Sequence, residues 1–267
     1  MNEVKPFNNW INVTACPLCS NPYSDATTSV NIPGAAIMAV TAGELSFPIS
    51  FSVVYNECPW CGMIYQNPTL NQAGLNEFYK PDGLYRELTK TKTNYAVEEN
   101  RSERLIGVIE KMAVQSVLDI GCGHGELLKL CQDRGMDVQG IDMTPDHCID
   151  SIPACGSLAE LGDKKYDLVT MIHMLEHVPD PIGELKIAAG HANKYIMIEV
   201  PKYDLGDYTV RYLNLPHVLI FRTWTLVSAM ERAGIDVLSL ATFRRSIIAV
   251  GEVKGVERHY LNDDNQT

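Results

Sequence analysis

The chain has 267 residues, of which 46% are apolar and 21% charged, which suits one medium-sized domain with a small module and argues against disorder. Its formal net charge of −11 opposes binding to phosphate backbones, so nucleic acid is not an expected partner. No apolar run approaches the ~18 residues of a membrane span, and residues 1–10 lack the features of a signal peptide, so we expect a cytoplasmic protein without membrane association.

Two Cys-x-x-Cys pairs mark the N-terminal part of the chain: Cys16 with Cys19, and Cys58 with Cys61. Thiols stay reduced in the cytosol, so this spacing predicts a metal centre rather than disulfides. Four thiolates complete the tetrahedral shell of Zn²⁺ and leave no open position, which predicts a structural role. Four unligated thiols are the alternative, and a redox role is disfavoured because neither pair follows a strand and opens a helix.

The remaining elements follow in chain order. Apolar residues alternate from Phe47 to Tyr55, which predicts one half-buried strand leading into the second cysteine pair. Residues 70–112 have a helical pattern with a turn at 81–83. Beyond them we predict strands at 116–120, 137–142, 166–172 and 194–200 with helices between, a helix at 223–233, and strands at 235–240 and 245–252. This alternation predicts a doubly wound, mainly parallel α/β sheet.

A glycine cluster follows the first of these strands, in the order Asp119, Gly121, Cys122, Gly123, Gly125. Glycines there allow a tight turn and a close approach of backbone to ligand at the carboxyl edge of the sheet. The dinucleotide fingerprint needs a third glycine where Glu126 stands, and a Walker A loop needs Gly-Lys-Ser/Thr, so neither motif matches. Asp142 ends the next strand and can accept hydrogen bonds from the hydroxyls of a ribose, which several nucleoside cofactors carry.

The motif Asp119-x-Gly-x-Gly-x-Gly125 with Asp142 resembles the S-adenosylmethionine (SAM) site of class I methyltransferases. The resemblance continues through Tyr166-Asp167, Glu176-His177-Val178-Pro179, Glu199-Val200-Pro201 and Ala233-Gly234. It implies a Rossmann-like sheet with a final antiparallel strand, and SAM as cofactor. The expected units are a zinc-binding β module at 1–69, a helical linker or lid at 70–112 and a methyltransferase domain at 113–267.

The same resemblance implies roles for single residues. Gly121 and Gly123 would contact the methionine portion of SAM, and Asp142 the ribose. Met143, Ser157 and Leu158 would line the adenine site. The rest of the expected cofactor-binding set is Asp119, Cys122, Gly125, His173 and Tyr85.

The cysteine module ahead of Asn67-Pro68, Phe78-Tyr79 and Tyr85 is similar to one subgroup of these enzymes, whose members are associated with sugar, capsule or natural-product modification. The resemblance implies a small-molecule acceptor with a hydroxyl or amine group. Lys202, Arg211 and Arg222 surround the region after strand 194–200, which suggests an anionic acceptor such as a phosphate or carboxylate; three solvated surface charges are the alternative.

Methyl transfer is an in-line displacement that needs a positioned, deprotonated nucleophile. The candidate catalytic residues are His173 and Glu199, which lie at strand ends, and His217, which lies in the connection that follows. Glu199 can equally accept hydrogen bonds from backbone amides, and we expect His177 to be structural and Tyr79 to be a core or lid residue. Some methyltransferases bind a divalent ion through Glu-x-x-Glu-His at this position; here His173 replaces the first Glu.

Two other functions fit the same motifs. A non-catalytic SAM-binding or scaffold protein would keep the cofactor loop without a general base. A macromolecular methyltransferase acting on protein or RNA is the third possibility, and the acidic charge argues against RNA.

Overall fold

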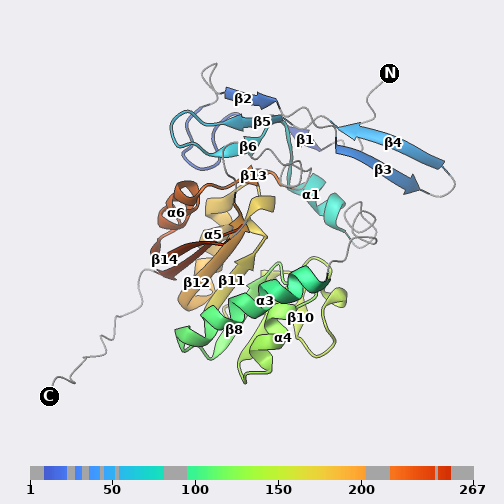
Figure 1. Cartoon of the computed structure of the whole chain (residues 1–267). Helices are drawn as coiled ribbons and strands as arrows, with labels where there is room; N and C mark the ends of the chain where they lie inside the picture. The colour runs from blue at the N-terminus through green and yellow to red at the C-terminus, as the bar shows by residue number, and fades with distance from the viewer. Residues whose placement is uncertain are drawn as a thin grey trace.

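The structure, a computed structural model, describes residues 9–22, 28–31, 36–42, 45–51, 54–80, 95–202, 217–243 and 246–253. A large sheet with its helices occupies one end of the molecule and a group of small sheets the other, with strand β13 between them (Figure 1). None of the helices in the described ranges combines the length and the apolar character needed to cross a bilayer.

The large sheet has seven strands in the order β10-β9-β8-β11-β12-β15-β14. Their bounds are β8 Ser116–Ile120, β9 Asp137–Ile141, β10 Ala154–Cys155, β11 Tyr166–Ile172, β12 Ala192–Pro201, β14 Ile235–Phe243 and β15 Ser246–Val253. Strands β10, β9, β8, β11 and β12 run parallel to one another, and β15 runs antiparallel to both β12 and β14. The predicted Rossmann-like sheet with a final antiparallel strand is therefore confirmed.

Helices cover both faces of this sheet: α3 Tyr95–Ile109, α4 Glu126–Gln132, α5 Pro181–Gly190 and α6 Thr223–Arg232. Successive side chains of a strand point to opposite faces. Val117 and Leu168 accordingly belong to the core beneath α3 and α4, whereas their neighbours Leu118 and Val169 belong to the core beneath α5 and α6. The result is a three-layer α/β/α domain, with short 3₁₀ turns at η1 Glu110–Met112, η2 Pro145–His147, η3 Leu158–Leu161 and η4 Leu175–His177.

The N-terminal module consists of small antiparallel sheets followed by helix α1 Gln72–Tyr79. The strands are β1 Trp10–Ile11 with β7 Thr69–Leu70, β3 Ala36–Ala42 with β4 Leu45–Phe51, and β2 Thr28–Asn31, β5 Val54–Glu57 and β6 Ile64–Gln66 in a third sheet. The expectation of one strand from Phe47 to Tyr55 is wrong, because β4 pairs with β3 while β5 pairs with β2 and β6. A period of two shows which side chains share a face and carries no information about the partner strand.

The module and the large domain share one sheet. β13 Leu219–Ile220, which follows β12 in the chain, pairs antiparallel with β6 and completes a four-stranded sheet in the order β13-β6-β5-β2. Helix α3, from the expected linker, packs Leu105, Ile106 and Ile109 into the core of the large domain. The proposed boundaries at residues 69 and 112 stay predictions, and the two parts form a continuous packed structure across the first of them.

Two glycine substitutions test this packing. A Cβ at Gly251 in β15 would overlap Ile235 and lie 3.0 Å from the Asp236 carbonyl oxygen, so Gly251→Ala should lower the free energy of unfolding by about 1–3 kcal/mol. A Cβ at Gly107 in α3 would meet no atom of the described residues within 4 Å. Because alanine favours the helix over glycine, Gly107→Ala should raise the free energy of unfolding by about 0.5–1 kcal/mol. Denaturant titration measures both, and effects of the same sign would contradict the packing described.

Candidate active site and metal centre

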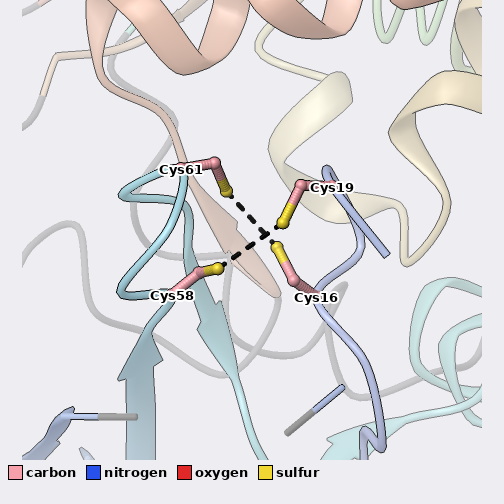
Figure 2. Close-up of side chains that lie close together, drawn as sticks. All are labelled: Cys16, Cys19, Cys58 and Cys61. Atoms are coloured by element: carbon pink, nitrogen blue, oxygen red, sulfur yellow. Dashed lines mark hydrogen bonds between the residues drawn. The ribbon is translucent and has the colours of Figure 1, made fainter. Parts of the chain in front are cut away.

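The four cysteines of the module converge on one point (Figure 2). Cys16 Sγ lies 3.5 Å from Cys61 Sγ, Cys19 Sγ lies 3.6 Å from Cys58 Sγ, and all four sulfurs lie within 4.8 Å of one another. Tetrahedral zinc with Zn–S bonds of about 2.3 Å separates its sulfur ligands by about 3.8 Å. The thiols therefore have the chemistry and the spacing of a closed structural zinc shell.

Backbone turns arrange each cysteine pair. The Ser20 N–H donates to the Cys16 carbonyl and the Gly62 N–H to the Cys58 carbonyl, both at 2.9 Å. Ser20 and Gly62 each follow the second cysteine of a pair and have left-handed φ angles of 60° and 73°. Glycine adopts this left-handed conformation without strain, which favours Gly62 at the end of the second turn. The two turns point their cysteines inward.

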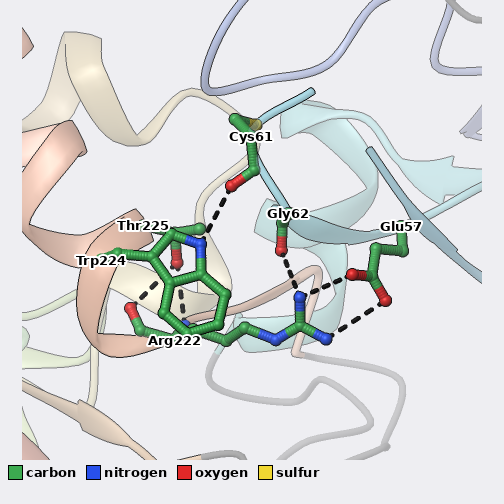
Figure 3. A network of polar contacts seen from close by, with 6 residues as sticks. All are labelled: Glu57, Cys61, Gly62, Arg222, Trp224 and Thr225. Carbon is green, nitrogen blue, oxygen red and sulfur yellow. Dashed lines mark hydrogen bonds and ion pairs between the residues drawn. The ribbon is translucent and has the colours of Figure 1, made fainter. Parts of the chain in front are cut away.

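A buried arginine joins the second turn to helix α6 (Figure 3). The Arg222 side chain is 6% exposed. Its guanidinium donates to both carboxylate oxygens of Glu57, at 2.6 and 3.1 Å, and to the Gly62 carbonyl oxygen at 3.1 Å. The Trp224 indole N–H donates to the Cys61 carbonyl at 3.1 Å. The expectation that Arg222 serves an anionic acceptor is therefore wrong, because Glu57 already binds its charge; Arg211 lies outside the described residues.

The glycine loop after β8 has one open position. Gly121, Gly123 and Gly125 have φ angles of 80°, 54° and 83°, which L-residues with side chains rarely adopt. A Cβ at Gly121 would lie 2.8 Å from Met174 Cγ, and one at Gly125 would lie 2.6 Å from Cys148 Sγ. A Cβ at Gly123 would meet no described atom within 4 Å. Packing thus requires Gly121 and Gly125, and Gly123 faces space that a ligand can enter.

Two acidic residues flank this loop. Asp142 Oδ2 accepts a hydrogen bond from the Gly123 N–H at 3.0 Å, and Oδ1 accepts from the Thr144 N–H at 2.9 Å. Asp119 is buried beneath the loop, where it accepts a 2.6 Å hydrogen bond from the Thr170 hydroxyl. Burial raises the pKa of Asp119 to about 7, with the Thr170 hydrogen bond acting against the rise. Asp142 is the accessible carboxylate of the pair.

The other expected cofactor residues gather at the same edge of the sheet. Met143 is 45% exposed beside Asp142, and Ser157 and Leu158 follow β10, which pairs with β9. Cys122 turns its side chain into the core beneath α3 and α4, so only its backbone can meet a ligand. Tyr85 lies outside the described residues.

His173 lies between two buried glutamates. Its Nδ1 is 3.4 Å from Glu176 Oε1 and its Nε2 is 3.5 Å from Glu199 Oε1, and Arg104 donates to Glu199 at 2.8 Å. Burial lowers the pKa of His173, but its interactions with both glutamates outweigh burial and raise that pKa to about 9. Burial likewise opposes ionisation of Glu176 and Glu199, and His173 holds the pKa of each at about 2. The two glutamates favour the protonated form of His173, which argues against a role as general base.

A second histidine cluster adjoins the first. The Tyr79 hydroxyl and His177 Nδ1 share a 2.7 Å hydrogen bond, and the His177 and His217 ring centroids are 4.8 Å apart. Ligand atoms of Glu176, His177 and His217 lie within 4.8 Å of one another and can hold a cation. The sequence predicted a structural role for His177 and a core or lid position for Tyr79, but it did not predict that they contact each other. The Glu176-His177 dipeptide was a local signal, but nothing in the sequence linked Tyr79 to a residue 98 positions away.

A small cleft opens beside this cluster and encloses about 10 Å³. Its lining contains both polar and apolar residues: Glu176, Lys202 and His217, with Pro201, Leu219, Ile220 and Phe221. Glu176 and Lys202 follow the carboxyl ends of β11 and β12, so the cleft lies at the same edge of the sheet as the glycine loop. This enclosed space of about 10 Å³ is far below the ~300–1,000 Å³ of typical small-molecule sites, so only a small group of an acceptor fits into it.

The doubly wound sheet with an open glycine position at its carboxyl edge defines an α/β protein built to bind a ligand there. The family model described as a methyltransferase domain matches residues 82–240, more than half of the chain, and the chain belongs to this family. The resemblance inferred from the motifs is thereby confirmed.

Comparisons with individual proteins are more limited. The chain is 31% identical over 132 residues to the ubiquinone biosynthesis O-methyltransferase of Idiomarina loihiensis, covering 44% of this chain and 51% of that protein. It is 32% identical over 120 residues to the enzyme of the same name from Methylococcus capsulatus, covering 40% and 48%. The chain thus spans about half the length of the curated relatives it matches. The crystal structure of a SAM-dependent methyltransferase from Archaeoglobus fulgidus shares the fold, with a TM-score of 0.50, 23% identity and coverage of 63% of this chain and 98% of that one.

The cysteine geometry predicts one structural zinc ion. Cys58→Ser removes one of four ligands, so it should release most of the bound zinc and lower the melting temperature, because metal binding contributes folding energy. Elemental analysis and thermal unfolding measure both effects. The matched control is Cys155→Ser, which removes a thiol of the large domain that lies outside the four-cysteine cluster. Equal zinc content in the two variants would exclude this metal centre.

The raised pKa of His173 predicts how stability depends on pH. Its pKa rises from 6.5 to about 9 on folding, so its stabilising contribution is complete below about pH 6.5 and is lost as the pH rises through 9. His173→Gln should cost about 3–5 kcal/mol near neutral pH, because it leaves two buried carboxylates poorly compensated, and should flatten this dependence. Urea titrations from pH 6 to about 9.5 test this, with His191→Gln as control. A parallel loss of stability in both variants would contradict the assignment.

Proposed function

We propose that the protein is a SAM-dependent methyltransferase that moves a methyl group to a hydroxyl or amine of a small molecule in the cleft. The observation that carries this proposal is the pairing of two sites at one sheet edge: the open Gly123 position beside Asp142, and the cleft between Glu176, Lys202 and His217. Membership of the methyltransferase-domain family and the names of the curated relatives support it.

The residues present fit SAM. The backbone around Gly121 and Gly123 would hold its methionine portion, Asp142 would accept hydrogen bonds from the ribose, and Met143 and Leu158 would contact the adenine. The open space above Gly123 and the exposed apolar surface of Met143 support this arrangement. When bound, SAM supplies an electrophilic methyl group.

The polar side of the cleft has the groups that an acceptor requires. His217 is the proposed general base because it lines the cleft, whereas His173 lies between Glu176 and Glu199. Accepting a proton is the step that turns a hydroxyl or amine into a competent nucleophile. The wall formed by Leu219, Ile220 and Phe221 would exclude water and position the apolar part of the acceptor.

A narrower acceptor class follows from Lys202. Lys202 is one of the residues that line the cleft, and a positive charge there would favour a carboxylate or phosphate on the acceptor. We therefore propose an anionic or sugar-related metabolite, as in polysaccharide, capsule or natural-product modification. The relatives named for ubiquinone biosynthesis support oxygen as the acceptor atom.

Two substitutions separate cofactor binding from catalysis. Asp142→Ala removes a charged hydrogen-bond acceptor, so it should weaken binding of S-adenosylhomocysteine at least about tenfold by calorimetry. His217→Asn should leave that affinity within about twofold and lower turnover about 100-fold in transfer of a labelled methyl group to a panel of phenols, hydroxy acids and sugar phosphates.

Asp146→Ala removes an exposed carboxylate near Asp142 and is the matched control. Unchanged affinity of Asp142→Ala would overturn the cofactor site. Tight cofactor binding without transfer to any acceptor would favour a non-catalytic SAM-binding protein.

A further inference from the structure

We propose that the four-cysteine module holds one wall of the acceptor cleft in place, with Tyr55 and Arg222 as positioning residues for the segment 217–222. This inference rests on the proposed function only in taking the cleft as the acceptor site. It gives the metal centre a part in shaping that site, beyond stabilising its own module.

The cleft wall is a strand of the module. Leu219 and Ile220 line the cleft as β13, and they pair with Tyr65 and Ile64 of β6. The Gln66 N–H, just after these pairs, donates to the Val218 carbonyl at 2.8 Å. Since β6 begins soon after the Cys58–Cys61 turn, the register of the wall depends on where that turn lies.

The proposed base is attached to the same module. The buried Tyr55 hydroxyl donates to the His217 carbonyl at 2.7 Å. Tyr55 lies in β5, where it pairs with Gln66 on one side and Val30 on the other, and β5 leads directly into Cys58. This hydrogen bond locates the backbone of His217, and hence the distance of its ring from His177 and Glu176.

Arg222 fixes the other end of the segment. It binds Glu57, which immediately precedes Cys58, and the carbonyl of Gly62, which immediately follows Cys61. Trp224 adds a hydrogen bond to the Cys61 carbonyl itself. Residues 217–222 are therefore held at both ends and in the middle by groups that flank or belong to the second cysteine pair.

Metal loss should affect the two halves of the site differently. Without its ion, the Cys58–Cys61 turn keeps local backbone hydrogen bonds, such as Gly62 N–H to the Cys58 carbonyl, and the contacts from Arg222 and Trp224, but loses the bonds that join it to Cys16 and Cys19. The cysteines, β6 and β13 belong to one hydrophobic core, which also reaches Ile120 and Ile141, whereas α3, α4 and Val138 of β9 belong to the other. Removal of zinc should loosen the cleft wall and leave the core beneath α3 and α4 intact.

Hydrogen–deuterium exchange on the full chain, zinc-loaded and chelator-stripped, tests this directly. Peptides covering 54–66 and 217–222 should exchange at least about tenfold faster after stripping, while peptides covering 126–141 change less than about twofold. S-adenosylhomocysteine affinity should stay within about threefold. Unchanged exchange at 217–222 would overturn the proposal, and so would uniform opening of the whole chain, which would make the metal a support for the entire fold.

Two variants test the positioning residues while the cysteines stay intact. In zinc-loaded protein, Tyr55→Phe and Glu57→Gln should keep the zinc content and S-adenosylhomocysteine affinity of the parent but speed exchange at 217–222 at least about threefold. Lys194→Gln, which removes the 3.3 Å ion pair with Asp167, is the control and should leave that exchange unchanged. Parent-like exchange in both variants would overturn the role of Tyr55 and Arg222. Failure of the parent to bind S-adenosylhomocysteine would instead overturn the proposed function.

Discussion

The ion pair between Arg222 and Glu57 is the interaction on which the arrangement of the two parts of the molecule depends. A buried guanidinium is destabilising unless its charge is paired. The Glu57 carboxylate accepts two hydrogen bonds from Arg222, and the Gly62 carbonyl accepts a third. Arg222 immediately precedes α6, and Glu57 ends β5, which pairs with β6. The apolar core then continues without a break from the cysteines to the sheet face beneath α5 and α6.

Buried charge also decides the chemistry at the carboxyl edge of the sheet. Arg104, Glu199, His173 and Glu176 form a chain of alternating sign from α3 to η4. Each charge there is stable because its neighbour has the opposite sign. As a consequence, His173 interacts with two carboxylates, while His217 lines the cleft.

The parts that could be predicted from sequence are those with local signals. Six of the seven strands of the large sheet, the helix expected at 223–233, the glycine loop and the cysteine pairs depend on residues close in sequence, and their expected positions agree with the structure to within a few residues. The two-residue strand β10 was not predicted. The division of 47–55 between two sheets, the burial of Arg222 and the contact between Tyr79 and His177 depend on partners far along the chain. Periodicity and motif spacing carry no information about such partners.

The place of β13 in the N-terminal sheet has a consequence for how the chain folds as it is synthesised. Glu57 and Arg222 are 165 residues apart in sequence. The cysteine turns can form as soon as the first quarter of the chain emerges from the ribosome, but the edge of β6 stays unpaired until β13 arrives. Such a long-range contact forms late and slowly, so a nascent chain exposes an open strand edge for most of its synthesis.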